Sequence, residues 1–122
     1  MQSALIAHEL RVFRGAMQLS LHQFGFETCE ATDQNSMFVL LAKQKPQLLL
    51  IDSKFPPFGA AEAIRAARGF DSGGTKIVAV VADNDFALAA NLRGIGANDV
   101  ILGGYTADKL RQKLRAVGLI GN

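Results

Sequence analysis

Five short apolar runs alternate with segments of helical periodicity along the whole chain, and this alternation constrains the fold more than any other feature. The runs are Ala4 to Ala7, Glu27 to Glu30, Leu48 to Ile51, Ile77 to Val81 and Val100 to Leu102. Four of them are apolar throughout, as parallel strands buried on both faces are, while the run with two glutamates suits an edge. Strands that alternate with helices predict a parallel sheet built from βα units.

Helix signals occupy the segments between these strands. The predicted helices are Phe13 to Phe24, about Asn35 to the residue before Pro46, Ala60 to Arg68, Asp83 to Ile95, and Thr106 to Val117. Asp33 and Thr106 are good N-caps, and Gly25, Gly69 and Gly96 stand where helices commonly end. The pattern predicts a doubly wound α/β fold, (βα)5, with a five-stranded parallel sheet in the flavodoxin-like strand order 2-1-3-4-5.

Length, charge and cysteine content narrow the class of protein. A chain of 122 residues with 49% hydrophobic residues predicts one domain over residues 1–122. A net charge of +2 gives no reason to expect direct nucleic-acid binding. Cys29 is the single cysteine, which excludes a disulfide within the chain and favours a cytoplasmic location. The first residues do not resemble a secretory signal, and the apolar runs are too short to cross a membrane.

Charged residues gather at the predicted ends of two neighbouring strands. His8 and Glu9 follow the first strand, and Asp52 follows the apolar run Leu48 to Ile51. In the order 2-1-3-4-5, the first and third strands are neighbours where the chain order reverses, which is the usual ligand crevice of such sheets. The sequence therefore predicts a functional site around Asp52.

The run Leu49-Leu50-Ile51-Asp52-Ser53-Lys54-Phe55-Pro56 resembles the receiver domain of bacterial two-component response regulators, and the resemblance covers nearly the whole chain. In that family the aspartate ending the third strand accepts a phosphoryl group from a histidine kinase, and a proline follows four residues later. The resemblance implies that Asp52 is the phosphoacceptor. It also implies an acidic pocket formed with the pair His8-Glu9, where the family has two acidic residues.

Several positions depart from the family pattern. His8 replaces an acid, Val81 stands where the family has threonine or serine, and Gly103 stands where it has the lysine that pairs with the phosphoryl group. Val100 replaces the aromatic residue that changes position on phosphorylation in many members. Because charge-assisted contacts to phosphate are the strong ones, loss of the lysine weakens phosphoryl transfer most. We interpret the chain as a degenerate, or pseudo-, receiver.

The resemblance implies a function in phosphorelay signalling, not an enzyme. We expect the domain to contact signalling proteins such as a histidine kinase, a phosphotransfer protein or a downstream effector. No tightly bound cofactor is expected, and Mg²⁺ would be held weakly by Glu9, Asp52 and the backbone carbonyl of Lys54. The family's usual partner surface, which also serves homodimers, lies on the fourth helix, fifth strand and fifth helix; here it includes Arg93, Asn98, Tyr105, Lys109 and Lys113.

Alternatives remain open at this stage. The chain is also consistent with a competent phosphoacceptor that uses Asp52 with help from Glu9. His8 either forms a pair with one of the carboxylates, Asp52 or Glu9, or is a surface histidine. We favour the surface histidine. A flavodoxin-like electron carrier shares the strand order, but the segment after the first strand lacks the hydroxyls and glycines of a flavin phosphate loop. A metal-dependent phosphatase is weaker still, because no second general acid follows Asp52 at the expected offset.

Overall fold

The computed structural model describes residues 1–70 and 74–121, and strands and helices alternate strictly within them. The strands are β1 (Gln2–Ala7), β2 (Phe26–Ala31), β3 (Leu48–Asp52), β4 (Lys76–Val80) and β5 (Asp99–Ile101). The helices are α1 (Arg11–Gln23), α2 (Gln34–Gln44), α3 (Ala60–Phe70), α4 (Phe86–Ile95) and α5 (Ala107–Ala116). In the part of the chain that is described, no helix combines the length and apolar character needed to span a membrane.

The strands form one parallel sheet in the order β2-β1-β3-β4-β5, as predicted. The strand with two glutamates, β2, lies at an edge, which confirms the interpretation of its polar residues. Asp52 pairs with Val80 at the carboxyl end of the sheet, while Ala7, the last residue of β1, pairs with Ile51. The end of β1 and the end of β3 therefore meet at the predicted crevice.

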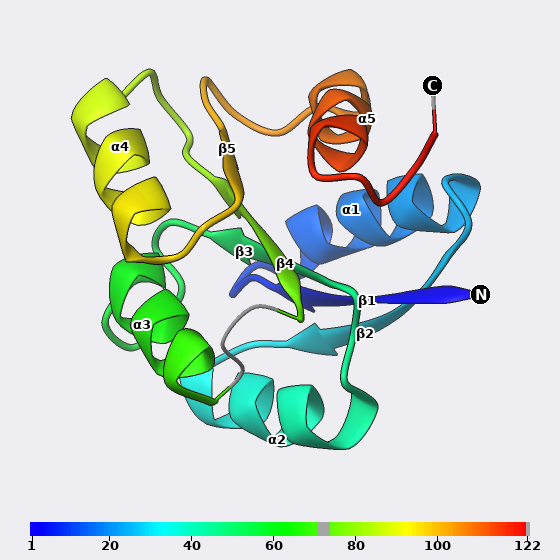
Figure 1. Ribbon diagram of the computed structural model, residues 1–122, viewed down its shortest axis with the longest axis horizontal. Helices are drawn as coiled ribbons and strands as arrows, with labels where there is room; N and C mark the ends of the chain where they lie inside the picture. The colour runs from blue at the N-terminus through cyan, green and yellow to red at the C-terminus, as the bar shows by residue number, and fades with distance from the viewer. Residues whose placement is uncertain (71–73, 122) are drawn as a thin grey trace.

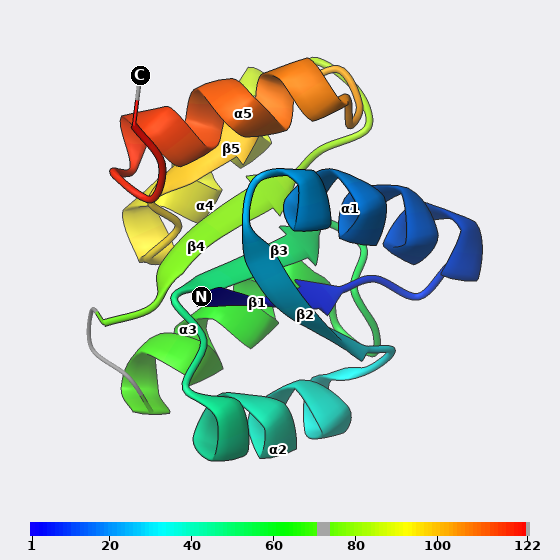
Figure 2. The ribbon, with the colours of Figure 1, turned by 90° about the vertical axis from the view of Figure 1, so that its right-hand side faces the viewer.

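Helices cover both faces of the sheet and divide the core into two layers. Figure 1 shows α1 and α5 on one face and α2, α3 and α4 on the other, and Figure 2 shows the twisted sheet between the two groups of helices. Alternate residues of β3 belong to different layers: Leu48 and Leu50 pack with α1 and α5, while Leu49 and Ile51 pack with the other three helices. All four are fully buried, as expected for a central parallel strand.

Caps set several helix boundaries where the sequence predicts them. The Asp33 carboxylate accepts the backbone N–H of Ser36 at 2.8 Å, and the Thr106 hydroxyl accepts that of Lys109 at 3.1 Å. Both residues are therefore N-caps. Gly25 follows α1 with φ of 92°, in the left-handed region that favours glycine at a helix end.

Several helix boundaries differ from the prediction by one to three residues, and two of these differences have a clear local cause. The helix α3 passes through Gly69 and reaches Phe70, because a single exposed glycine costs a helix only about 1 kcal/mol. The helix α4 begins at Phe86 and not at Asp83, since Asp85 is the residue whose carboxylate caps the N–H of Leu88.

Candidate functional site

Asp52 lies at the carboxyl end of β3 with 20% of its side chain exposed. Its Oδ2 accepts the backbone N–H of Lys54 at 3.1 Å, and its Oδ1 lies 3.6 Å from Nε2 of His8. The predicted carboxylate is thus accessible and sits directly opposite the end of β1. Both of its oxygens face nitrogen atoms.

His8 is buried beside Asp52, with only 6% of its surface exposed, so the expectation of a surface histidine is wrong. Its Nδ1 accepts the backbone N–H of Leu10 at 3.0 Å, which places the ring proton on Nε2, facing Asp52. The ring stacks on Phe13 with centroids 5.0 Å apart. Burial lowers the pKa of His8, Arg14 adds to this effect, and Asp52 opposes it. The geometry and the burial both favour a neutral imidazole.

Glu9 has a different environment from its neighbour. The residue is exposed, and its backbone carbonyl accepts a hydrogen bond from Nη1 of Arg14 at 2.8 Å. In residues 1–70 and 74–121, no carboxylate, imidazole or thiol cluster of three or more members is placed to hold a metal. Mg²⁺ prefers a near-octahedral set of oxygens, whereas His8 directs an N–H at Asp52. The side chains around Asp52 therefore form no such cluster, and weak binding of Mg²⁺ by Glu9, Asp52 and the Lys54 carbonyl stays a prediction.

The three remaining positions of the predicted switch carry no polar side chain. Val81 and Val100 are buried in the layer under α3 and α4. Gly103 has φ of 72°, and a Cβ built there would lie 3.3 Å from Nζ of Lys109. That ammonium donates to the carbonyls of Leu102 at 2.8 Å and Gly104 at 3.2 Å. A cation from α5 thus occupies the turn after β5, a placement that the sequence analysis missed.

The family model described as response regulator receiver domain matches residues 4–115. The chain belongs to this family. Among solved structures, a response regulator from Thermotoga maritima shares 24% identity with a TM-score of 0.85, over 96% of this chain and 97% of that one. Chemotaxis protein CheY4 from Vibrio cholerae shares 18% identity with a TM-score of 0.87, over 96% and 98%. No curated protein matches the chain.

A third solved structure is a chain of the CheX-CheY complex with BeF3 and Mg+2 from Borrelia burgdorferi. It shares 15% identity with a TM-score of 0.87, over 95% of this chain and 88% of that one. At these identities the structures establish the flavodoxin-like fold and the strand order of the receiver domain.

An ion network organises part of the receiver's predicted partner surface. The Asp99 carboxylate contacts Arg93 at 3.0 Å and Lys113 at 3.2 Å, and it also accepts the N–H of Val100 at 2.8 Å. Burial acts to raise the pKa of Asp99, but these donors outweigh it and hold that pKa below its ordinary value. Two predicted surface cations are therefore fixed around one carboxylate.

Asn98 and Tyr105 are the two uncharged residues predicted for the partner surface. Oδ1 of Asn98 accepts Nη2 of Arg68 and the N–H of Ile77, both at 2.7 Å. The Tyr105 hydroxyl is buried and has no hydrogen-bond partner in the described residues. Burial raises the pKa of Tyr105, and the Ser20 hydroxyl opposes this rise without reaching hydrogen-bond geometry. Their part in partner contact stays a prediction.

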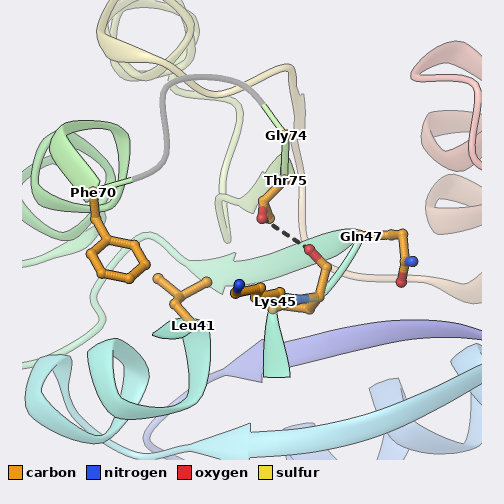
Figure 3. Close-up of a pocket in the computed structure, with 7 residues that line it drawn as sticks. Leu41, Lys45, Gln47, Phe70, Gly74 and Thr75 are labelled. Carbon is orange, nitrogen blue, oxygen red and sulfur yellow. Dashed lines mark hydrogen bonds between the residues drawn. The ribbon is translucent and has the colours of Figure 1, made fainter. Parts of the chain in front are cut away.

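A cavity among the described residues lies away from Asp52. It has a volume of about 490 Å³ at the amino end of the sheet and is lined by Leu41, Lys45 and Phe70, among others. Figure 3 shows these side chains and the hydrogen bond from the Thr75 hydroxyl to the carbonyl of Pro46, at 2.9 Å. None of the predicted site residues lines this cavity.

Proposed function

We propose that this receiver domain is degenerate and serves two-component signalling through contacts with partner proteins, with Asp52 phosphorylated weakly or not at all. Its partners would be a histidine kinase, a phosphotransfer protein or a downstream effector. The observation that carries the proposal is the buried His8 imidazole, whose Nε2 lies 3.6 Å from the Asp52 carboxylate where receivers have an acid.

Phosphoryl transfer depends on groups that neutralise the charge of the transferred phosphoryl oxygens. Beside Asp52, His8 is favoured in its neutral form, and Val81 offers no hydroxyl. The Lys109 ammonium is engaged by two backbone carbonyls. The Lys54 side chain is exposed and forms no ion pair with Asp52. A phosphoryl group on Asp52 would therefore lack the strong charge-assisted contacts that stabilise it.

A competent phosphoacceptor is the second candidate, and one observation favours it. The Asp52 side chain is 20% exposed and keeps room beside it, so a small phosphodonor has access to the carboxylate. In this alternative a histidine kinase phosphorylates Asp52 despite the altered pocket.

Incubation with acetyl phosphate and Mg²⁺, followed by intact-protein mass spectrometry, separates the two candidates. The proposal predicts at most a minor phosphorylated fraction of the native chain. Asp52→Asn provides the background for phosphorylation at other residues. A phosphorylated species that makes up most of the native chain and is lost in Asp52→Asn would establish the competent phosphoacceptor instead.

The proposed partner surface comprises α4, β5 and α5, with Arg93, Asn98, Tyr105, Lys109 and Lys113. Its support is the pair of partly exposed cations held by Asp99, Arg93 at 45% and Lys113 at 29% side-chain exposure. Such anchored cations favour an acidic partner face. A homodimer through the same surface is the alternative. Analytical ultracentrifugation tests it, because a homodimer of the native chain that dissociates in Arg93→Glu would place the dimer interface on this surface.

A further inference from the structure

A small cavity lies against Asp52 on the face of the sheet covered by α1 and α5. Its volume is about 190 Å³, and its apolar walls come from α1, from the end of β4 and from the turn after β5. The residues that line its walls include Phe13, Ala82, Gly104 and Tyr105. An apolar cavity of about 150 Å³ is enough to hold benzene, so this one accommodates a body of about one ring.

The polar end of this cavity carries one uncompensated charge. Asp52 and His8 both line it, and the only contact that Asp52 makes with a basic side chain in residues 1–70 and 74–121 is with that imidazole. Because Nδ1 of His8 accepts the N–H of Leu10, the ring presents an N–H without a full positive charge. The Lys109 ammonium is held by the carbonyls of Leu102 and Gly104. A carboxylate in an apolar recess attracts a cation and repels an anion.

The walls also suit a cation that carries an apolar body. Phe13 and Tyr105 contribute aromatic rings, and the face of an aromatic ring attracts a nearby cation. Gly104 adds no side chain to the lining, and a Cβ at this position would lie 3.7 Å from the Ala82 carbonyl oxygen. We propose that this cavity binds a small primary ammonium compound, with its ammonium at Asp52 and an apolar body of about one ring between Phe13 and Tyr105.

This proposal goes beyond the proposed signalling role, since it assigns the pocket a ligand of its own. The probe is 2-phenylethylamine, titrated into the native chain without Mg²⁺ and followed by amide NMR shifts. The expected result is a saturable shift of the amides of His8, Asp52 and Tyr105. Its neutral analogue 2-phenylethanol should bind about tenfold more weakly, because it cannot form the charge-assisted contact.

Three variants locate the site. Asp52→Asn should weaken binding of the amine about tenfold, while Glu27→Gln, which removes an exposed carboxylate near the start of β2 and outside the cavity, should leave it unchanged. Ala82→Leu should abolish binding by filling the cavity. Ala82 is exposed, so this variant keeps its fold, which the amide spectrum reports directly.

Saturable binding that Ala82→Leu and Asp52→Asn both reduce supports the proposal. The proposal is overturned if the shifts do not saturate, if 2-phenylethanol binds as tightly as the amine, or if folded Ala82→Leu binds like the native chain. The acetyl phosphate experiment contains no amine, so its outcome is independent of this one.

Discussion

Among the surface-facing arginines of the receiver, we expect truncation of Arg68 to destabilise the fold most. Its guanidinium joins α3 to the segments that flank β4 and β5. It donates to the Gly96 carbonyl at 3.0 Å, to the Thr75 carbonyl at 2.8 Å and to Oδ1 of Asn98 at 2.7 Å. Because the same Asn98 oxygen accepts the N–H of Ile77, Arg68→Ala disturbs the start of β4 as well.

The magnitude follows from these three bonds. Hydrogen bonds to a charged group contribute about 1.5–3 kcal/mol each, and partial exposure of Arg68 reduces this to about 1 kcal/mol per bond. The substitution Arg68→Ala should therefore lower the free energy of unfolding by about 3 kcal/mol. With a urea slope of about 1.5 kcal/mol per M, the unfolding midpoint falls by about 2 M.

Urea unfolding followed by far-ultraviolet circular dichroism measures this shift. Arg65→Ala is the matched control, because Arg65 lies on the same helix, is exposed and forms none of these bonds. The control should change the midpoint by less than about 0.5 M. Equal midpoints for Arg68→Ala and Arg65→Ala would refute the proposed role of the guanidinium.

Three further predictions concern neighbouring features. Gly96 has φ of 134°, and an added Cβ would lie 2.6 Å from Cγ of Arg68. Gly96→Ala should therefore cost more stability when it is made in the native chain than when it is made in the Arg68→Ala variant, which lacks the clashing atom. Equal losses of stability in the two backgrounds would contradict the clash. Burial lowers the pKa of His8 from 6.5, so the unfolded chain takes up a proton first and stability falls as pH drops below about 6.5. The loss of stability at low pH should be smaller in His8→Gln than in the native chain. Identical plots of melting temperature against pH for the two proteins would contradict this prediction. The pKa of Asp99 is lowered, so its stabilising effect is present above the ordinary value of 3.8 and is lost as pH falls through the folded-state pKa. Asp99→Asn should therefore lower the melting temperature at neutral pH and not in strong acid, and an equal loss at both would contradict the network.

Most of the fold was predictable from local patterns. The runs Leu48 to Ile51 and Ile77 to Val81 matched β3 and β4 to within one residue at each end. The two glutamates of β2 correctly marked an edge, since only an edge strand leaves such side chains partly in water. Continuous apolar runs indicate burial on both faces, and that is enough to derive a doubly wound sheet.

Details that depend on distant contacts were not predictable. Asp83, Asn84 and Asp85 are all residue types that commonly cap a helix. In the structure Asp85 caps α4, while the backbone carbonyl of Asp83 accepts a hydrogen bond from the distant N–H of Gly103. The burial of His8 depends on Phe13, which stacks on it from α1. No period or spacing in the sequence reports such a contact.

The candidate site was predictable in position but not in chemistry. Asp52 and His8 do meet where the strand order reverses. Lys109 was assigned to a partner surface on its helix position alone, yet its ammonium bonds to the carbonyls of Leu102 and Gly104. Long flexible side chains reach bonding partners that their position on a helix does not reveal.

Beryllofluoride binding with Mg²⁺, measured by fluorine NMR, tests the central claim most directly. A stable adduct on Asp52 needs the same cations and charge-assisted donors as a phosphoryl group, and the side chains of His8, Val81 and Gly103 supply no cation and only the N–H of a neutral imidazole. The account predicts no bound fluorine signal for the native chain. A saturable bound signal that disappears in Asp52→Asn would contradict it and would establish a working phosphoacceptor.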